Sequence, residues 1–428
     1  MTSSAWTWMI YMATNNNVEL AGEQSLISMR AAIEQLAEQV SVLVQQATQT
    51  SSVRRILGAS PEVVRDLGQI DSGDPATLID FIRWAATTAP AQRYALIIWS
   101  HGSGWEPSEM ERLAKQPVPP VPPGLPGLQP AKNPVTMAEL TQRGADDGRK
   151  VFFSSTMRKM LSLDEPLNRA IAFDDGSGHS LDTIELGNVL AQATQKLGQP
   201  IDLLGMNACL MSNVEVAYQL RNHARVYIAS EDLMPAQSWP YDDILARLKA
   251  QPGIDAAALG KMVVERYCAF YSAPSPGSGQ PQPGVTLTAL QIAGVEPLAT
   301  AVHAFADALQ VNIAQQVNAI WAAHRAAHTF PFRLYDLADF CRAFVAQATA
   351  APASTAAANN VLTALTDPAF LLASQYTSKN YDDTGGVTTY LIPPLPGKQP
   401  SPYYAETDYS QATDWGKFLI AYFAAVQK

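Results

Sequence analysis

Residues 201–209 read Ile-Asp-Leu-Leu-Gly-Met-Asn-Ala-Cys, and this stretch decides which class of fold the chain can adopt. Its first six residues form a short, mostly apolar run, which is typical of a strand buried in a parallel sheet. A turn over 207–209 follows at once, and helical periodicity starts at Leu210. The stretch therefore predicts a strand, a turn and a helix in succession, which is the repeating unit of an α/β fold.

The same alternation of short apolar runs and longer helical patterns extends along most of the chain. Strands are expected at residues 6–13, 40–46, 94–100, 201–206, 226–230, 285–291 and 387–392, and helices at 18–39, 75–88, 181–197, 212–222 and 254–271. We therefore expect an α/β/α layered fold, with a largely parallel sheet and helices on both faces. In such folds, binding and catalysis gather at the carboxyl ends of the strands.

Two proline-rich segments divide the chain. Residues 107–167 contain the run PVPPVPPGLPGLQP followed by scattered basic residues, a composition typical of extended surface chain, and we expect an insertion there. Residues 273–284, APSPGSGQPQPG, predict a linker. The expected organisation is a first domain over 1–272, this linker, and a C-terminal α/β region over 285–428 that packs on the first domain.

The composition argues against several classes of protein. The net charge is −10 and no stretch concentrates Lys and Arg, so nucleic-acid binding is not expected. No apolar run approaches the roughly 18 residues that a membrane-spanning helix needs, so no membrane association is expected either. The N-terminus lacks a basic segment followed by an apolar one. We therefore expect a cytoplasmic protein, or a secreted one if a signal peptide has been removed.

The cysteines and histidines give little support for a disulfide framework or a metal site. Three cysteines without CxxC-like spacing are too few and too scattered for either role. Among the six histidines, His324 and His328 form the only pair that could face one ligand, and no acid or thiol stands close by in sequence. We expect that pair to lie on an exposed helix face, without a metal.

Two segments place a reactive side chain directly after a predicted strand. His101 follows the run 94–100 and precedes a glycine, a position that suits a general acid or base as well as a turn histidine that caps the strand. Cys209 lies between a strand end and a helix N-terminus, where the helix dipole favours the thiolate. A buried structural cysteine is the alternative at this position. Cys268 and Cys341 lie within helical patterns and fit that structural role.

Several sequence blocks, taken in chain order, resemble the clostripain family of peptidases, which has a caspase-like fold. Two of them contain the candidate residues: YALIIWSHGSGW at 94–105 and DLLGMNACLM at 202–211. The others lie at residues 6–17, 71–75, 215–218, 230–231, 239–241, 335–340 and 385–393. The similarity thus covers nearly the whole chain, and it implies that residues 1–272 form a caspase-like catalytic domain.

The resemblance implies a cysteine endopeptidase that acts on protein or peptide substrates. Cys209 would attack the scissile carbonyl to form an acyl-enzyme, while His101 would move the protons. The backbone amides of Gly102 and Cys209 would form the oxyanion hole. This chemistry requires no metal or other cofactor. Calcium dependence is known in the family, and the acidic pair Asp174-Asp175 could contribute to a calcium site.

The chain departs from the family in the residues that choose the substrate. Clostripain-like enzymes prefer to cut after Arg or Lys, which requires an acid to pair the cation. Here Gln237-Ser238 replaces the usual acid before a Gly-Trp pair, and Asn207 stands where the family usually has Asp. The candidate substrate-binding residues are Asn207, Ser230, Glu231, Asp232, Gln237 and Trp239. Glu231 or Asp232 could supply the missing charge, or could instead cap or buttress the loop.

Self-processing is a further expectation from the family, whose members mature by cleavage between the catalytic His and Cys. The basic sites Arg143, Arg149-Lys150 and Arg158-Lys159 in the insertion are candidates. A caspase-like interaction protein with little or no activity is the alternative function. A serine hydrolase that uses Ser100 or Ser103 is not expected, because neither serine lies in a GxSxG motif. The sequence does not predict the oligomeric state.

Overall fold

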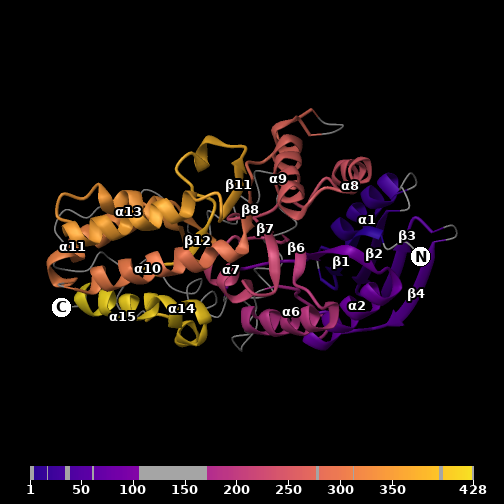
Figure 1. The fold of residues 1–428 in the computed structure, drawn as a ribbon, viewed down its shortest axis with the longest axis horizontal. Coiled ribbons are helices and arrows are strands. Elements are labelled where there is room, and N and C mark those ends of the chain that lie inside the picture. Colours follow the sequence, from indigo (N-terminus) through magenta and orange to yellow (C-terminus); the bar gives the residue numbers. More distant parts are fainter. Residues whose placement is uncertain are drawn as a thin grey trace.

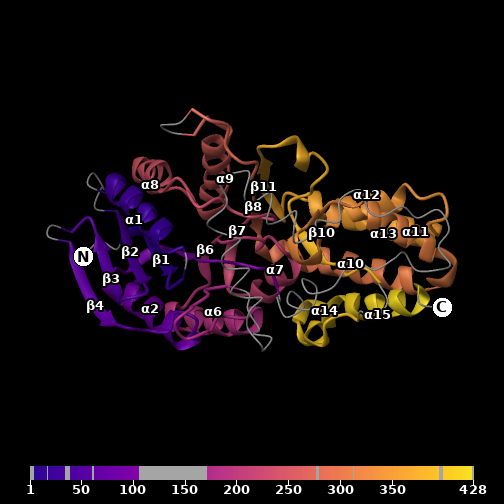
Figure 2. The ribbon, with the colours of Figure 1, turned by 180° about the vertical axis from the view of Figure 1, so that it is seen from behind.

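The computed structural model describes residues 4–16, 18–33, 39–59, 62–105, 171–275, 279–311, 313–394 and 399–426. The insertion expected at 107–167, with its candidate cleavage sites, lies outside these residues. The molecule is elongated, with the large sheet toward one end and a group of C-terminal helices at the other (Figure 1). Figure 2 shows the same division from behind.

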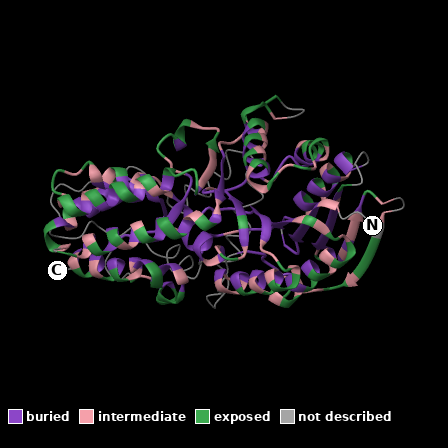
Figure 3. Cartoon of the chain, in the orientation of Figure 1, coloured by how far each residue is buried: buried purple, intermediate pink, exposed green. Residues whose placement is uncertain are grey.

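A nine-stranded sheet forms the centre of the fold, in the order β11-β8-β7-β6-β5-β1-β2-β3-β4. The strands are β1 Ser4–Ala13, β2 Val40–Ala47, β3 Ser52–Leu57, β4 Val63–Gly68, β5 Ala91–Trp99, β6 Ile201–Asn207, β7 Ala224–Ala229, β8 Thr286–Gln291 and β11 Leu371–Tyr376. The five central strands, from β7 to β2, pair in parallel. The strands outside them pair antiparallel on both sides. The central strands are buried, whereas the edge strand β4 is largely exposed (Figure 3).

Helices cover both faces of this sheet, as the apolar runs of the central strands require. Helices α1, α8 and α9 lie on one side, and α2, α6 and α7 on the other (Figure 1). Their bounds are α1 Glu19–Ile33, α2 Pro75–Thr88, α6 Thr183–Leu197, α7 Val214–Leu220, α8 Tyr241–Ala250 and α9 Ala256–Ser272. Local sequence fixes their ends: Asp182 and Glu185 form a capping box at the start of α6, and Gly198 ends it in the left-handed conformation.

The C-terminal region contributes strands β8 and β11 to the large sheet and adds a bundle of helices with a small sheet of its own. The helices are α10 Val295–Gln310, α11 Ile313–Ala326, α12 Leu337–Val345, α13 Pro352–Thr366, α14 Asp408–Thr413 and α15 Trp415–Val426. The small sheet has the order β12-β10-β9, with β9 Thr329–Phe330, β10 Leu334–Asp336 and β12 Thr388–Tyr390. The large sheet is therefore continuous across the expected linker at 273–284.

Three details of the fold differ from the sequence predictions. Helix α7 begins at Val214, two residues after the predicted start at residue 212, and the helical periodicity expected from Leu210 is interrupted because Leu210 has a φ of 66°. His324 does not lie on an exposed face: its side chain is 2% exposed and contacts Tyr335 and Tyr422. His328 lies beyond the end of α11, so the two histidines do not share a helix face. In the described part of the chain, no helix is long and apolar enough to cross a membrane.

Candidate active site

The two residues of the expected catalytic pair follow neighbouring parallel strands at matched positions. Trp99 of β5 is in register with Asn207 of β6, and His101 and Cys209 each come two residues later. The Ser100 amide donates to the Asn207 carbonyl oxygen at 3.3 Å, so the strands are still joined where the two loops begin. Neighbouring strands lie about 4.8 Å apart. The topology thus brings both loops to one edge of the sheet.

Gly102 allows the loop after β5 to approach the nucleophile's backbone. A Cβ atom at this position would lie 2.5 Å from the carbonyl oxygen of Cys209 and 3.0 Å from the Ala208 Cβ. A carbonyl oxygen cannot yield as a flexible side-chain end can, so the loop accommodates only glycine without a shift. The segment after His101 is therefore packed directly onto the turn that holds Cys209.

Cys209 lies in a tight turn and its side chain has a backbone donor. The residue is 5% exposed, and its Sγ accepts a hydrogen bond from the Met234 amide at 3.2 Å. The prediction that a helix N-terminus adjoins the thiol is wrong, because α7 starts only at Val214. The donor comes instead from the loop after β7, and a donor to sulfur stabilises the charged thiolate over the neutral thiol.

His101 is held in an apolar environment. Its side chain is 6% exposed, and its ring meets Phe173 edge-on at a centroid distance of 6.2 Å. Burial lowers the pKa of His101 to about 3. The imidazole is therefore neutral at physiological pH, and it can accept a proton only if a nearby anion such as a thiolate offsets the effect of burial.

The loop over 230–234 is held by a hydrogen bond within the loop and by another to strand β8. The Ser230 hydroxyl donates to the Asp232 carbonyl oxygen, and the Glu231 amide donates to the Thr286 hydroxyl of β8. Glu231 is fully buried, and burial together with the nearby carboxylates of Asp336 and Asp232 raises its pKa well above the usual value. Burial disfavours the ionised form of this carboxyl, which makes it a poor partner for a basic substrate side chain.

Asp232 has both carboxylate oxygens occupied by donors within the protein. Its Oδ1 accepts from the Leu233 amide at 2.7 Å, and its Oδ2 accepts from the Tyr381 hydroxyl at 2.6 Å. These bonds match the alternative in which the acid buttresses the loop. The role of Asp232 in substrate binding stays a prediction.

The remaining candidate specificity residues lie at different depths. Asn207 is buried and donates through Nδ2 to the Ser238 hydroxyl and, at 3.0 Å, to the Tyr241 hydroxyl. Trp239 is 1% exposed and packs against Gly205, where a Cβ would meet the indole at 2.6 Å, so its side chain belongs to the core. Gln237 is exposed. The substrate-binding roles of these residues also stay predictions.

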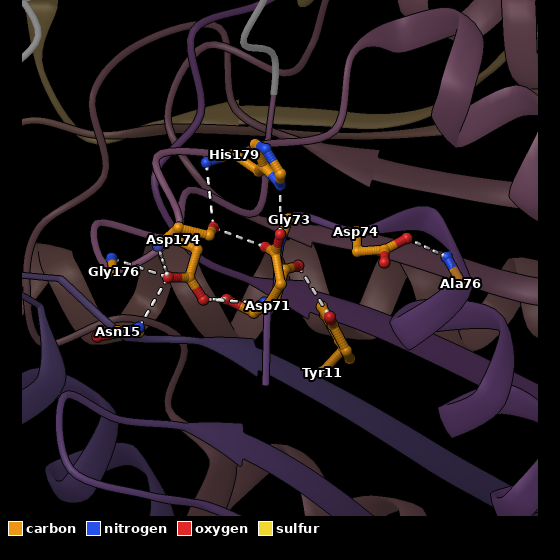
Figure 4. A network of polar contacts seen from close by, with 11 residues as sticks. Tyr11, Asn15, Asp71, Gly73, Asp74, Ala76, Asp174, Gly176 and His179 are labelled. Atoms are coloured by element: carbon orange, nitrogen blue, oxygen red, sulfur yellow. Dashed lines mark hydrogen bonds and ion pairs between the residues drawn. The ribbon is translucent and has the colours of Figure 1, made fainter. Parts of the chain in front are cut away.

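A polar network beside the site was not predicted from the sequence (Figure 4). The buried carboxylate of Asp174 accepts from Asn15 after β1, from the amide and hydroxyl of Ser72 after β4, and from the amides of Gly176 and Ser177. Five donors thus fill both of its oxygens, and a calcium ion would have to displace some of them. The calcium expectation stays a prediction.

The same network fastens the segment that follows the insertion. The Asp71 carboxylate contacts the ring of His179 and accepts from the Ser177 hydroxyl at 2.8 Å. The Asp174 amide donates to the His179 carbonyl oxygen, which closes the turn. Because Phe173 precedes this turn and contacts His101, the network holds one wall of the histidine's surroundings in place.

Other candidate nucleophiles are buried and engaged in the fold. Burial raises the pKa of Cys268 to about 12 and raises the pKa of Cys341 further. The Ser100 hydroxyl donates to the Ala13 carbonyl oxygen at 3.0 Å, and Ser103 is 2% exposed. The burial of these four residues fits structural roles.

Among the described residues, one cluster could hold a metal ion by proximity alone: His303, Asp307 and Asp414. It lies on the surface of the C-terminal bundle. Lys417 already forms an ion pair with Asp414 at 2.7 Å, and no deeply buried ligand completes the group. The cluster fits solvated ion pairs on helix surfaces.

Comparison with known proteins decides the family. A sequence profile of the clostripain family matches residues 10–116 and 147–422, which is most of the chain. The chain belongs to the clostripain family. Clostripain of Hathewaya histolytica is 37% identical to it over 95 residues, which is 20% of this chain and 18% of that protein. The match therefore spans less than a fifth of that relative.

Solved structures confirm the caspase-like α/β/α fold expected for this clostripain-family member. One is a secreted cysteine protease from Bacteroides thetaiotaomicron in complex with an irreversible peptide inhibitor, at 19% identity and a TM-score of 0.62. Another is an inactive zymogen protease from Parabacteroides distasonis, at 16% identity and a TM-score of 0.62. Each alignment covers 96% of this chain and 99% of the other.

Proposed function

We propose that the chain is a cysteine endopeptidase in which His101 and Cys209 form the catalytic dyad. The observation that carries the proposal is the matched placement of the two residues after paired strands, with Gly102 packed onto the Cys209 carbonyl oxygen. Family membership supports the same chemistry. The substrates are proteins or peptides.

In the proposed reaction, His101 takes the thiol proton and the Cys209 sulfur attacks the scissile carbonyl carbon. The peptide C–N bond then breaks, His101 protonates the leaving amine, and water hydrolyses the resulting thioester. The amides of Gly102 and Cys209 donate to the oxyanion that forms at each step. The Met234 amide, which already contacts Sγ, stabilises the thiolate before attack.

A mechanism-based probe tests this proposal directly. A peptide acyloxymethyl ketone should label the wild type and Cys268→Ala, because Cys268 is buried and has a raised pKa. Labelling should vanish in Cys209→Ala and fall at least about 100-fold in His101→Ala. Labelling that needs Cys209 but is unaffected by His101→Ala would overturn the dyad. Absence of labelling in the wild type would support the interaction-protein alternative.

The proposal includes a change in which residue is preferred before the scissile bond, relative to the Arg or Lys preference of the family. Glu231 is buried with a raised pKa, Asp232 accepts from the Tyr381 hydroxyl, and position 237 carries a neutral amide. These observations support weak selection for Arg and Lys.

The proposal also includes cleavage of the chain within 107–167. A cytoplasmic location remains only an expectation from the N-terminal sequence, and the similar protease from Bacteroides thetaiotaomicron is a secreted one.

A further inference from the structure

The hydrogen bond on the Cys209 sulfur comes from a loop whose position is set from far away in the chain. Met234 donates its amide to Sγ at 3.2 Å. It lies in the loop that follows β7, whose residues Ser230 and Asp232 accept from the backbone amides of Ser212 and Leu210. The direction of the Met234 N–H therefore depends on the contacts that hold residues 230–233.

Asp232 is the central anchor of that loop. Its carbonyl oxygen accepts from the Leu210 amide at 3.2 Å, which joins the loop to the residue next to the nucleophile. Its carboxylate accepts from the Leu233 amide and from the Tyr381 hydroxyl. A single residue thus connects the nucleophile's turn, the Met234 segment and the C-terminal region.

Tyr381 is well fixed to act on this anchor. Its side chain is 6% exposed and stacks on Phe330 at an interplanar angle of 13°. His328 also contacts the ring, at a centroid distance of 5.9 Å. The hydroxyl lies 2.6 Å from Asp232 Oδ2 and 3.4 Å from the Gly284 carbonyl oxygen. The rigid ring therefore presents its hydroxyl to Asp232 in one orientation.

We propose that Tyr381 is a positioning residue for the nucleophile: through Asp232 it aims the Met234 amide at the Cys209 sulfur. The inference rests on the proposed function and deepens it, because it assigns control of thiol reactivity to the C-terminal region. Without the Tyr381 hydroxyl, Asp232 Oδ2 loses its hydrogen bond and the loop over 230–234 can shift. The Met234 amide then no longer donates to the Cys209 sulfur. A thiolate without that donor is less stable relative to the thiol.

Other charged or titratable groups lie on the elements around the thiol, and Tyr381→Phe leaves all of them unchanged. His101 belongs to the loop after β5, and Glu231 and Asp232 belong to the loop after β7. Asp336 lies behind Glu231, on β10. A shift seen on removal of the Tyr381 hydroxyl therefore reports the hydrogen-bonded path, since that hydroxyl carries no charge.

The test measures the rate of Cys209 alkylation by iodoacetamide as a function of pH, with the modified peptide identified by mass spectrometry. This small reagent needs no peptide-binding site. Tyr381→Phe should raise the pH midpoint of alkylation by about one unit, because one hydrogen bond to a charged group contributes about that much. Tyr376→Phe is the matched control, since Tyr376 is 41% exposed with its ring 6.4 Å from Tyr381, and it should keep the wild-type midpoint.

Substitutions at Asp232 test the path itself. Asp232→Ala and Asp232→Asn both remove the carboxylate charge, so they are compared with each other: Asp232→Ala should give the higher midpoint, because Asn keeps an oxygen that accepts from Tyr381. The double variant Tyr381→Phe/Asp232→Ala should match Asp232→Ala alone, because both changes break one path. Additive shifts would overturn the proposal.

The outcomes also separate this inference from the proposed function. A wild-type midpoint in Tyr381→Phe, with the fold intact by circular dichroism, overturns the positioning role alone. Alkylation of wild-type Cys209 that is slow and independent of His101 defeats the proposed dyad, and this inference fails with it.

Discussion

Gly102 packs so closely against the backbone of Cys209 that no other residue would fit without a shift. A Cβ at position 102 would lie 2.5 Å from the Cys209 carbonyl oxygen. The contact joins the loop that holds the histidine to the turn that holds the thiol. The distance between the two loops therefore depends on the absence of a side chain at position 102.

Gly102→Ala should therefore separate the dyad. We expect kcat/KM to fall about 100-fold, since a displacement of about 1 Å in a catalytic site has that effect. Stability should fall by about 1–3 kcal/mol, because a backbone oxygen must shift. Peptide hydrolysis and urea unfolding measure the two effects. Gly253→Ala is the control, because its Cβ would meet nothing within 4 Å. Equal activity of the two variants would refute the argument.

The cleavage preference should be broad at the residue before the scissile bond. A peptide library digested by the wild type should show little enrichment of Arg or Lys, because the acids of the loop after β7 are buried or hydrogen-bonded. Strong basic enrichment that disappears in Glu231→Gln or Asp232→Asn would contradict this. The same profile on Asn207→Asp, which restores the family's usual acid, should show more basic selection.

Self-cleavage should divide the chain within residues 107–167. Prolonged incubation of the wild type should produce two fragments on a denaturing gel, with new termini at sites such as Arg143 or Arg149-Lys150. Cys209→Ala should remain one intact chain. If wild type and Cys209→Ala both stay intact, the self-processing hypothesis fails, while the acyl-enzyme chemistry remains testable by the probe.

Acid should destabilise the protein through its buried histidines. Burial lowers the pKa of His324 to about 3, whereas an unfolded histidine titrates near 6.5. The unfolded chain therefore binds more protons below pH 6.5, and stability falls as the pH drops toward 3. At pH 5 this group should cost about 2 kcal/mol relative to neutral pH.

His324→Phe should remove that part of the acid dependence while it keeps a ring between Tyr335 and Tyr422. Urea unfolding at pH 7 and pH 5 measures the difference. His101 stays in the variant and retains its own contribution, so the acid slope should shrink without vanishing. An unchanged slope would show that another group dominates.

The central strands and their helices could be predicted because their sequence signals are local. Strand β6 reads as an apolar run, and α2 was predicted with its observed bounds because Asp74 and Pro75 mark its start. Strands β3, β4 and β11 were missed. Polar residues interrupt each of them and much of their surface is not buried, so their pairing depends on partners elsewhere in the chain.

The placement of the proposed pair, His101 and Cys209, could be predicted for a similar reason, since each residue follows a recognisable strand. Its supports were not. The Met234 amide on Sγ, the Tyr381 hydroxyl on Asp232 and the Asp174 network join residues separated by 25, 149 and up to 159 positions. No local pattern encodes which backbone amide meets which side chain, so these contacts emerge only from the tertiary fold.

Strand β8 lies hydrogen-bonded along β7, and β11 lies along β8, so residues after the linker complete the sheet that carries the nucleophile. A gene truncated within 273–284 would leave the outer side of β7 bare, and such an edge recruits strands from other molecules. We expect that product to aggregate rather than yield a minimal protease. The two segments should instead melt together in a single transition, because neither has a complete core by itself.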